Sequence, residues 1–470
     1  MNESKTVTLH LHIAWASCLL GLLIVTPILA QTDATSDDIG QRSLMQSQLS
    51  ELERDLGRHD PALIESLVSL AEANADLNLF SEASVLIDRA IQIQRLNFGL
   101  YSDRQIPLYF EKIRFDSRRG DWQGANDSLD HVSWLLTEKQ VGTLESLVSN
   151  LMQMTELHLR AVAADDSAMQ AEHYRSAAEA TFMALEISSR LWGERDPRRA
   201  ELYYSLLKQF YLQSLAVEMR DETAYALRAI VPGSSWVRPR RVVQTRYFRA
   251  GLRLLAEMED IVVANSTVPR ETAAMVAIYR ADWQLLFNRE ESEKSYADAF
   301  TALQDLTDDA SKVNRLFARP QILPIGEFYN TVDAALAAQV RSTASLAASE
   351  VKNAESGEYY RFQEWFGELP LIAFPNFAPS LGILSAPEYS DVLLSFNLDS
   401  MNTVSRWVSG RYTTRRSVVD EFQIIADSAE MDIDTNYLEE RLHALNFRPR
   451  LVDGAVEPAA GTLLYRATID

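Results

Sequence analysis

The chain has 470 residues, of which 45 are Lys or Arg and 66 are Asp or Glu, so its formal net charge is −21 at pH 7. Hydrophobic residues make up 47% of the sequence, which is enough for a packed core, and the length exceeds that of one ordinary domain. A strongly acidic surface repels nucleic acid and anionic membrane, so we expect no nucleic-acid partner.

The N-terminus contains one long apolar stretch, from Ile13 to Ala30, after a short polar segment with Lys5. Ala30 follows Pro27 and precedes Gln31, which predicts that residues 1–30 are a secretory signal peptide. An uncleaved N-terminal anchor is the alternative, because an apolar stretch of this length can just span a bilayer. Both interpretations predict an exported protein in the periplasm or associated with the envelope, and only the anchor would contact the membrane.

Residues with catalytic or metal-binding chemistry are few. Cys18 is the only cysteine, and it lies within the apolar stretch, so cleavage would leave no thiol. The other signatures of an active site are absent from the sequence, including a His-Glu-x-x-His motif, a Gly-x-Ser-x-Gly elbow and phosphate or dinucleotide loops. Five histidines follow residue 30, and we expect each to be isolated. We therefore predict no enzyme, no cofactor and no metal. An enzyme whose carboxylates converge from distant parts of the chain is the open alternative.

Residues 31–48 are polar and predict a loose lead-in, whereas residues 49–305 carry apolar side chains at spacings of three and four, which predicts consecutive helices. Two stretches of this region match when one is shifted by 42 residues. The matching positions are a turn at Asn78 and Gly120, an aromatic at Phe80 and Trp122, and a small residue at Ala83 and Ala125. Small side chains allow two helices to approach closely, and the aromatic ring fills the gap beside the turn.

On these residues the chain resembles the tetratricopeptide-repeat family, in the 42-residue form of kinesin light chains. Three further units are looser matches: Tyr174, Ala177 and Ala184; Tyr203, Leu206, Leu207 and Phe210; and Ala281 to Phe300 around a turn at Asn288. The segment from Gly57 to Pro61 also recurs from Gly193 to Pro197.

In that family the first helices of successive hairpins line a groove that binds a protein or peptide. The resemblance implies groove residues two before, one after, five after and eight after the large residue at the fourth position of each unit, which is residue 67, 109 or 203. This count selects ten candidates: Glu65, Val68, Glu72, Phe110, Arg114, Ser117, Glu201, Tyr204, Lys208 and Tyr211. Aromatic rings beside Arg or Lys suit peptide recognition, since rings bury area and cations hold carboxylates. The same count yields alanines in the last unit, Ala274, Ala277 and Ala281, so we expect a weak groove there.

The C-terminal part has a different pattern. Residues 306–387 predict a helix and a Pro-rich linker. Residues 388–470 predict strands at 392–398 and 404–408, a helix at 438–445, and a hairpin of 447–452 with 463–469 around Asp453-Gly454. We expect Phe396, Leu442, Phe447 and Tyr465 to share a core.

This β-β-α-β-β order is similar to the C-terminal domain of TonB, through Leu445, Phe447-Arg448-Pro449 and Asp453-Gly454. A Tyr-Pro entry to the first strand and a long Pro/Lys-rich linker are missing from the sequence, so the resemblance implies the fold more than energy transduction.

The predicted fold class is mostly α, a tetratricopeptide-like α-helical solenoid followed by a small α+β domain. The predicted function is an exported scaffold that binds a partner peptide or protein within the bacterial cell envelope. A TonB-like adaptor that adds a partner strand to its sheet is the alternative, and an unrecognised enzyme is the third.

We predict that the exported protein begins near Gln31. The intact mass of the secreted product measures this directly, and a mass that includes Cys18 would contradict cleavage.

Overall fold

The computed structural model describes residues 36–217, 240–346, 357–363, 389–398, 404–408, 411–415, 419–427 and 446–468. The predicted signal peptide or anchor, residues 1–30, and the predicted helix at 438–445 lie outside these residues. Within the described ranges, none of the helices has the length and apolar character needed to cross a membrane.

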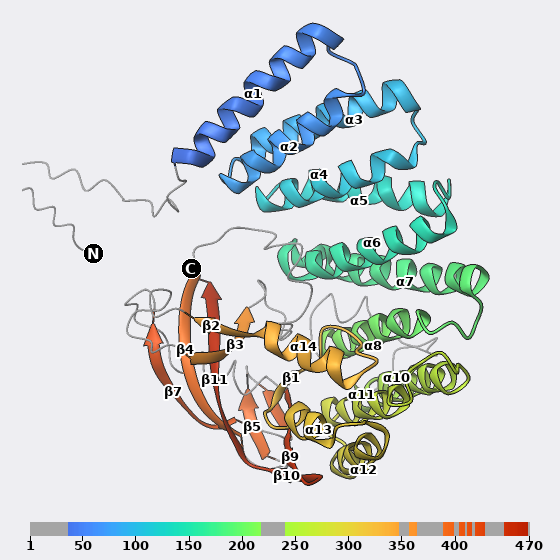
Figure 1. Cartoon of the computed structure of the whole chain (residues 1–470), viewed down its shortest axis with the longest axis vertical. Helices are drawn as coiled ribbons and strands as arrows, with labels where there is room; N and C mark the ends of the chain where they lie inside the picture. The colour runs from blue at the N-terminus through green and yellow to red at the C-terminus, as the bar shows by residue number, and fades with distance from the viewer. Residues whose placement is uncertain are drawn as a thin grey trace, which may run out of the picture.

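Helices from α2 to α12 contact each other in pairs, and the pairs stack into one curved array (Figure 1). The first helix of each pair is α2 (Leu63–Asp76), α4 (Ile106–Arg118), α6 (Leu144–Ala164), α8 (Arg199–Ala216) or α11 (Thr272–Leu286). The second helix is, in the same order, α3 (Phe80–Phe98), α5 (Trp122–Thr137), α7 (Gln170–Trp192), α10 (Arg240–Val263) or α12 (Glu291–Leu306). Short 3₁₀ turns, η1 (Asp103–Gln105) and η2 (Ser167–Met169), precede α4 and α7. The predicted helical repeat is therefore confirmed.

Three of the turns between paired helices have the same backbone geometry. Asn78, Gly120 and Asn288 adopt φ angles of 59°, 78° and 54°. In each turn this residue's amide donates to the carbonyl three residues earlier, and the following amide donates to the carbonyl five residues earlier. A left-handed residue ends a helix in this way, and Gly or Asn adopts that conformation at least cost. The sequence thus specifies where each of these hairpins turns.

The small residues predicted to lie between paired helices are buried. Ala83 in α3 and Ala125 in α5 have relative exposures of 0%. Both are at the same distance from their left-handed turn residue, so the repeat register predicted from the sequence holds for the first two hairpins.

The two related Gly-to-Pro segments form the same turn. Gly57 and Gly193 have φ angles of 90° and 93°. The side chains of Asp60 and Asp196 each accept a hydrogen bond from the amide two residues later, at 2.9 and 3.0 Å. Each segment joins the end of one helix to the start of the next first helix.

The predicted loose lead-in is wrong from residue 36 onward, because α1 (Ser36–Leu56) is a helix. Its only buried apolar side chain is Leu49, with Met45 and Leu52 partly buried beside it. One narrow apolar stripe is enough to hold a helix against α2, although so polar a sequence gives little periodic signal.

The region after the array contains more structure than the predicted helix and linker. α13 (Ala310–Leu316), strand β1 (Gln321–Leu323) and α14 (Val332–Ser342) follow α12. A five-stranded sheet has the order β2-β3-β11-β4-β7, with β2 (Thr343–Leu346), β3 (Gly357–Gln363), β4 (Tyr389–Leu398), β7 (Val419–Asp427) and β11 (Ala459–Thr468). It lies alongside the C-terminal half of the array, while α1 to α5 extend beyond it (Figure 1).

The strand pairing differs from the predicted β-β-α-β-β order, so a TonB-like fold is not shown. β5 (Val404–Val408) pairs with β6 (Arg411–Arg415) instead of with β4. The predicted strand 447–452 is broken at Pro449, which lacks an amide hydrogen, into β8 (Asn446–Arg448) and β9 (Arg450–Val452). The Asp453-Gly454 turn does form a hairpin, but it joins β9 to β10 (Ala455–Glu457) rather than to 463–469.

The predicted C-terminal core is confirmed for one pair. Phe396 and Phe447 are both buried, and their ring centroids lie 5.3 Å apart. Leu442 and the side chain of Tyr465 lie outside the described residues.

We predict that Ala83→Trp lowers the free energy of unfolding by about 1–3 kcal/mol, because an indole overpacks a contact with no exposed surface. Ala256→Trp, on the exposed face of α10, is the matched control and should change stability little. Chemical denaturation measures both, and equal stabilities for the two variants would contradict the helix contact at Ala83.

Candidate functional site

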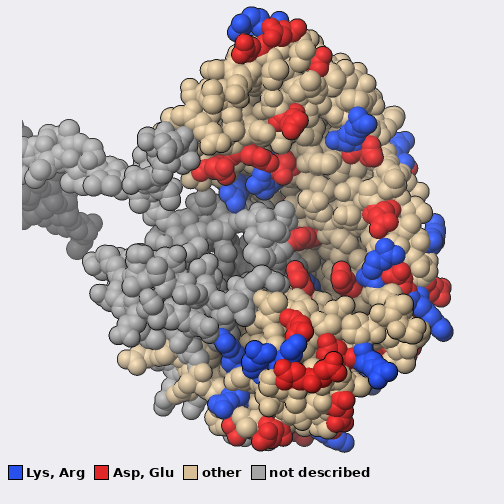
Figure 2. Space-filling view, viewed as in Figure 1, with Lys and Arg blue, Asp and Glu red and all other residues tan. Residues whose placement is uncertain are grey.

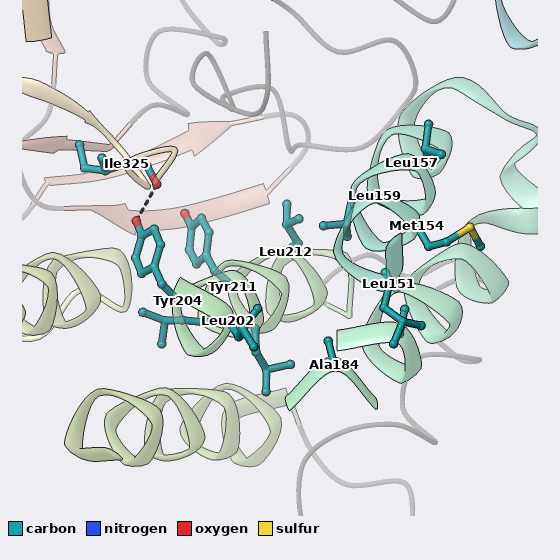
Figure 3. Packing of buried hydrophobic residues seen from close by; sticks show 14 of the residues in the cluster. Leu151, Met154, Leu157, Leu159, Ala184, Leu202, Tyr204, Tyr211, Leu212 and Ile325 are labelled. Carbon is teal, nitrogen blue, oxygen red and sulfur yellow. Dashed lines mark hydrogen bonds between the residues drawn. The ribbon is translucent and has the colours of Figure 1, made fainter. Parts of the chain in front are cut away.

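One face of α8 holds a loop segment of the same chain, whose backbone bends at Gly326 and Glu327. The Tyr204 hydroxyl donates to the Ile325 carbonyl at 2.6 Å, and the Lys208 ammonium donates to the Gly326 carbonyl. Tyr204 and Tyr211 project from the same side of α8, with Tyr204 directed at Ile325 (Figure 3). Residues spaced by four and three share a helix face, so the sequence spacing alone aligns these side chains.

The neighbouring first helix, α11, extends the same contact. The Tyr279 hydroxyl donates to the Glu327 carbonyl at 2.9 Å and accepts from the Tyr329 amide at 2.8 Å. The Thr272 hydroxyl donates to the Asn330 carbonyl at 2.8 Å. We call residues 325–330 the strap. Four side chains of the array donate to strap carbonyls, and the Phe328 ring packs against Tyr204 and Tyr279, so the array contacts both the backbone and the apolar side chains of this segment.

Strand β8 occupies the adjoining part of the same face. Asn446 donates to the Tyr211 hydroxyl at 3.0 Å, and Arg448 pairs with Asp282 of α11, whereas Phe447 between them contacts Phe396 of the sheet. Successive side chains of a strand point to opposite sides, so β8 presents two polar residues to the array and one aromatic to the sheet. β8 also pairs antiparallel with β1.

The contact between Arg448 and Asp282 is a buried, two-pronged ion pair. The Nε–Oδ1 and Nη2–Oδ2 distances are 2.9 and 2.5 Å, and both side chains are 6% exposed. The Tyr296 hydroxyl donates to Asp282 Oδ1 at 2.7 Å, and the guanidinium carbon lies 5.9 Å from the Tyr279 ring centroid. Burial opposes the charge, but the attraction and hydrogen bonds of Asp282 outweigh it and raise the pKa of Arg448. A planar guanidinium matches a carboxylate in this geometry, which an ammonium cannot reproduce.

Two further charged groups lie near the strap. Burial lowers the pKa of Lys208 to about 8, against the opposing negative charges of Glu156 and Glu327. Desolvation of the carboxyl group, followed by the negative charge of Glu327, raises the pKa of Glu201, although the residue as a whole is exposed. Of the groove residues predicted on α8, Tyr204, Lys208 and Tyr211 therefore contact the chain itself.

The groove residues predicted on α2 and α4 are not brought to the strap. Glu65 and Glu72 are exposed and Val68 is half-buried. Arg114, also half-buried, donates from Nε to Glu111 at 2.9 Å. The other two predicted residues on α4 present no surface: Phe110 belongs to the hydrophobic core, and Ser117 is buried and donates to the Arg114 carbonyl.

The expectation of a weak groove in the last unit is wrong, because Tyr279 and Asp282 of α11 bind the strap and β8. The count that selected alanines was one residue out of register. In the first two hairpins the large fourth position lies eleven residues before the left-handed turn residue, and the same interval before Asn288 gives Ala277. Counting five onward from Ala277 then gives Asp282. The left-handed turn residue Asn288 was therefore the signal that could have identified Asp282.

The expectation that every histidine is isolated is also wrong. The Nδ1 atoms of His158 in α6 and His173 in α7 are 3.1 Å apart, and His173 Nε2 lies 2.9 Å from Asp165 Oδ2. Burial and then the neighbouring His173 lower the pKa of His158 to about 3, so this ring is neutral at pH 7. In the part of the chain that the structure describes, no group of three His, Cys, Asp or Glu side chains is arranged to hold a metal ion.

We predict that Arg448→Met lowers the free energy of unfolding by about 3–5 kcal/mol, because it leaves the Asp282 carboxylate buried without its cation. Arg190→Met in α7 is the matched control, because it also removes an arginine from a carboxylate, that of Glu186. The Arg190 and Glu186 side chains are 68% and 65% exposed, so we expect this substitution to change the free energy of unfolding by less than about 1 kcal/mol. Denaturant unfolding of both variants tests the difference, and a loss for Arg448→Met no larger than the control's would contradict the buried pair.

No protein-family model matches this sequence, and a comparison with curated proteins finds no match. Among solved structures, the chain is similar to a Podosopora anserina putative kinesin light chain with nearly identical TPR-like repeats, at 14% identity and a TM-score of 0.33 over 53% of this chain and 99% of that one. A single-substitution variant of the same repeats gives 15% identity and a TM-score of 0.32 over 52% and 96%. The assignment of helical repeats depends on the hairpin and turn geometry of this chain itself.

Proposed function

We propose that this protein is a non-catalytic scaffold that holds an extended segment of a partner protein or peptide on the face formed by its first helices. The observation that supports this is the strap, whose carbonyls accept hydrogen bonds from Tyr204, Lys208, Tyr279 and Thr272. A face that holds a loop of its own chain through backbone hydrogen bonds and ring packing has the chemistry to hold a segment from another chain.

The proposed partner surface is on α2 and α4, because the strap and β8 already occupy α8 and α11. Glu65, Val68, Glu72 and Arg114 provide the accessible side chains there. Figure 2 shows both acidic and basic residues on the face of the molecule that is in view.

The location that we propose is the bacterial cell envelope, on the exported side. It is supported by the apolar stretch from Ile13 to Ala30 and by the placement of small Ala30 before polar Gln31.

Strand addition to the sheet is the second candidate function. Among the described strands, β7 is nine residues long and lies at one edge of the sheet, and an edge strand can pair with a partner strand. This candidate corresponds to the TonB-like adaptor and requires pairing of the partner along β7, whatever the topology behind it.

A photo-crosslinking amino acid in place of single exposed residues of the full chain separates these functions. We expect a crosslinked partner from position Glu72 on α2 and none from the control Glu179, which is exposed on the second helix α7. A crosslink from Gln423 on β7 and none from Glu72 would favour strand addition. Equal crosslinking at Glu72 and Glu179 would contradict a specific first-helix surface.

A further inference from the structure

The Asp282 pocket differs from the contacts that hold the strap, because it pairs with a charged side chain. The strap is held through its backbone carbonyls and through the packing of Phe328 against Tyr204 and Tyr279. Asp282 instead accepts two hydrogen bonds from the Arg448 guanidinium. Tyr211 accepts one from the side-chain amide of Asn446, which lies two residues before Arg448. The only charged group of β8 that the array binds is therefore an arginine.

Two tyrosine side chains besides Arg448 line the pocket around Asp282. Tyr296 from α12 fixes one carboxylate oxygen of Asp282, and the Tyr279 ring of α11 lies beside the guanidinium. A carboxylate at this depth is strongly destabilised without a cation, so any segment that replaces β8 must supply one in the same place.

The occupant itself is short. β8 has three residues and pairs with the three residues of β1 through Gln321–Arg448, Ile322–Phe447 and Leu323–Asn446. Arg448 lies 166 positions after Asp282, and the chain after it is also docked, because Leu451 is buried and its amide donates to the Phe317 carbonyl at 3.0 Å. A second extended segment could take both its place on the edge of β1 and its arginine site.

We propose that the Asp282 pocket and the edge of β1 form a second interaction surface, which takes an extended partner segment with an arginine preceded by an aromatic residue, in competition with β8. The arginine pairs with Asp282, and the aromatic side chain takes the position of Phe447 against Phe396. This surface deepens the proposed scaffold function, because it adds a requirement for an arginine to a face that otherwise binds backbone carbonyls and an aromatic ring.

Competition within one chain sets the expected affinities. A tethered segment acts at an effective concentration of about millimolar, so an external segment binds the wild-type chain weakly. Replacing Arg448 should raise the affinity of the chain for an external segment that carries an arginine. Replacing Asp282 should abolish that binding, whether or not Arg448 is present.

The probe is a synthetic peptide with the sequence of residues 446–452, Asn-Phe-Arg-Pro-Arg-Leu-Val, labelled and titrated into the full chain. We expect the Arg448→Gln chain to bind this peptide at least tenfold more tightly than the wild type does, and the Arg448→Gln, Asp282→Asn chain to lose that binding. Replacing Arg448 by Gln in the peptide should abolish binding, whereas replacing Arg450, which lies 3.8 Å from Glu457, should not. An Arg448→Gln chain that is folded by circular dichroism and binds both peptides equally would overturn the proposal.

A second measurement decides the case in which Arg448→Gln fails to fold. Hydrogen exchange of the wild-type chain in excess peptide should become faster at residues 446–448, because β8 is displaced from β1. Unchanged exchange there would overturn the proposal. So would a wild-type chain that sediments as a dimer and exchanges subunits, since a second copy would then be the occupant. These results are independent of crosslinking at Glu72, so each proposal can fail without the other.

Discussion

The buried pair of Asp282 and Arg448 is the interaction on which the arrangement of this protein depends. Neither charge is stable alone at 6% exposure, so the α11 helix and strand β8 must stay together for both to remain charged. Because β8 also contacts the sheet through Phe447 and pairs with β1, the ion pair joins three parts of the chain at one point. Such a pair adds little net stability over an apolar contact, but it fixes which segments meet and in which register.

The helical array provides the geometry for that pair. Left-handed turn residues end the first helices α2, α4 and α11 at defined places. On α8 and α11 the array carries hydroxyl and ammonium donors that reach the strap carbonyls. On α2 and α4 the predicted groove residues include exposed carboxylates and Arg114. The chain itself therefore occupies α8 and α11, and the partner surface that we propose is on α2 and α4.

The sequence was sufficient to predict features that depend on a few adjacent residues. Asn78 and Gly120 marked hairpin turns, and Ala83 and Ala125 marked close helix contacts, because backbone geometry and side-chain size act locally. Asp453-Gly454 marked a tight turn for the same reason. Tyr204 and Tyr211 of α8 were selected through the resemblance to tetratricopeptide repeats, although the segments that contact them were not predicted.

The remaining features depend on distant contacts. Nothing in the neighbourhood of Arg448 indicates a partner 166 positions earlier, and three-residue strands such as β1 and β8 are too short to give an alternating pattern. The pairing of His158 with His173 likewise requires the packing of α6 on α7. Helix α1 escaped prediction because one buried leucine and two partly buried neighbours are its whole apolar contact.

A double-mutant cycle of Asp282→Asn and Arg448→Gln in the full chain tests the central claim most directly, with stability measured by denaturant unfolding. If the two side chains form one buried pair, each single variant leaves the other group unpaired, and the double variant is more stable than the sum of the single losses predicts. We expect a coupling free energy of about 2–3 kcal/mol, at the upper end of what contacting residues show. Additive losses, with a coupling free energy below about 0.5 kcal/mol, would mean that Asp282 and Arg448 do not hold the C-terminal segments on the helical array.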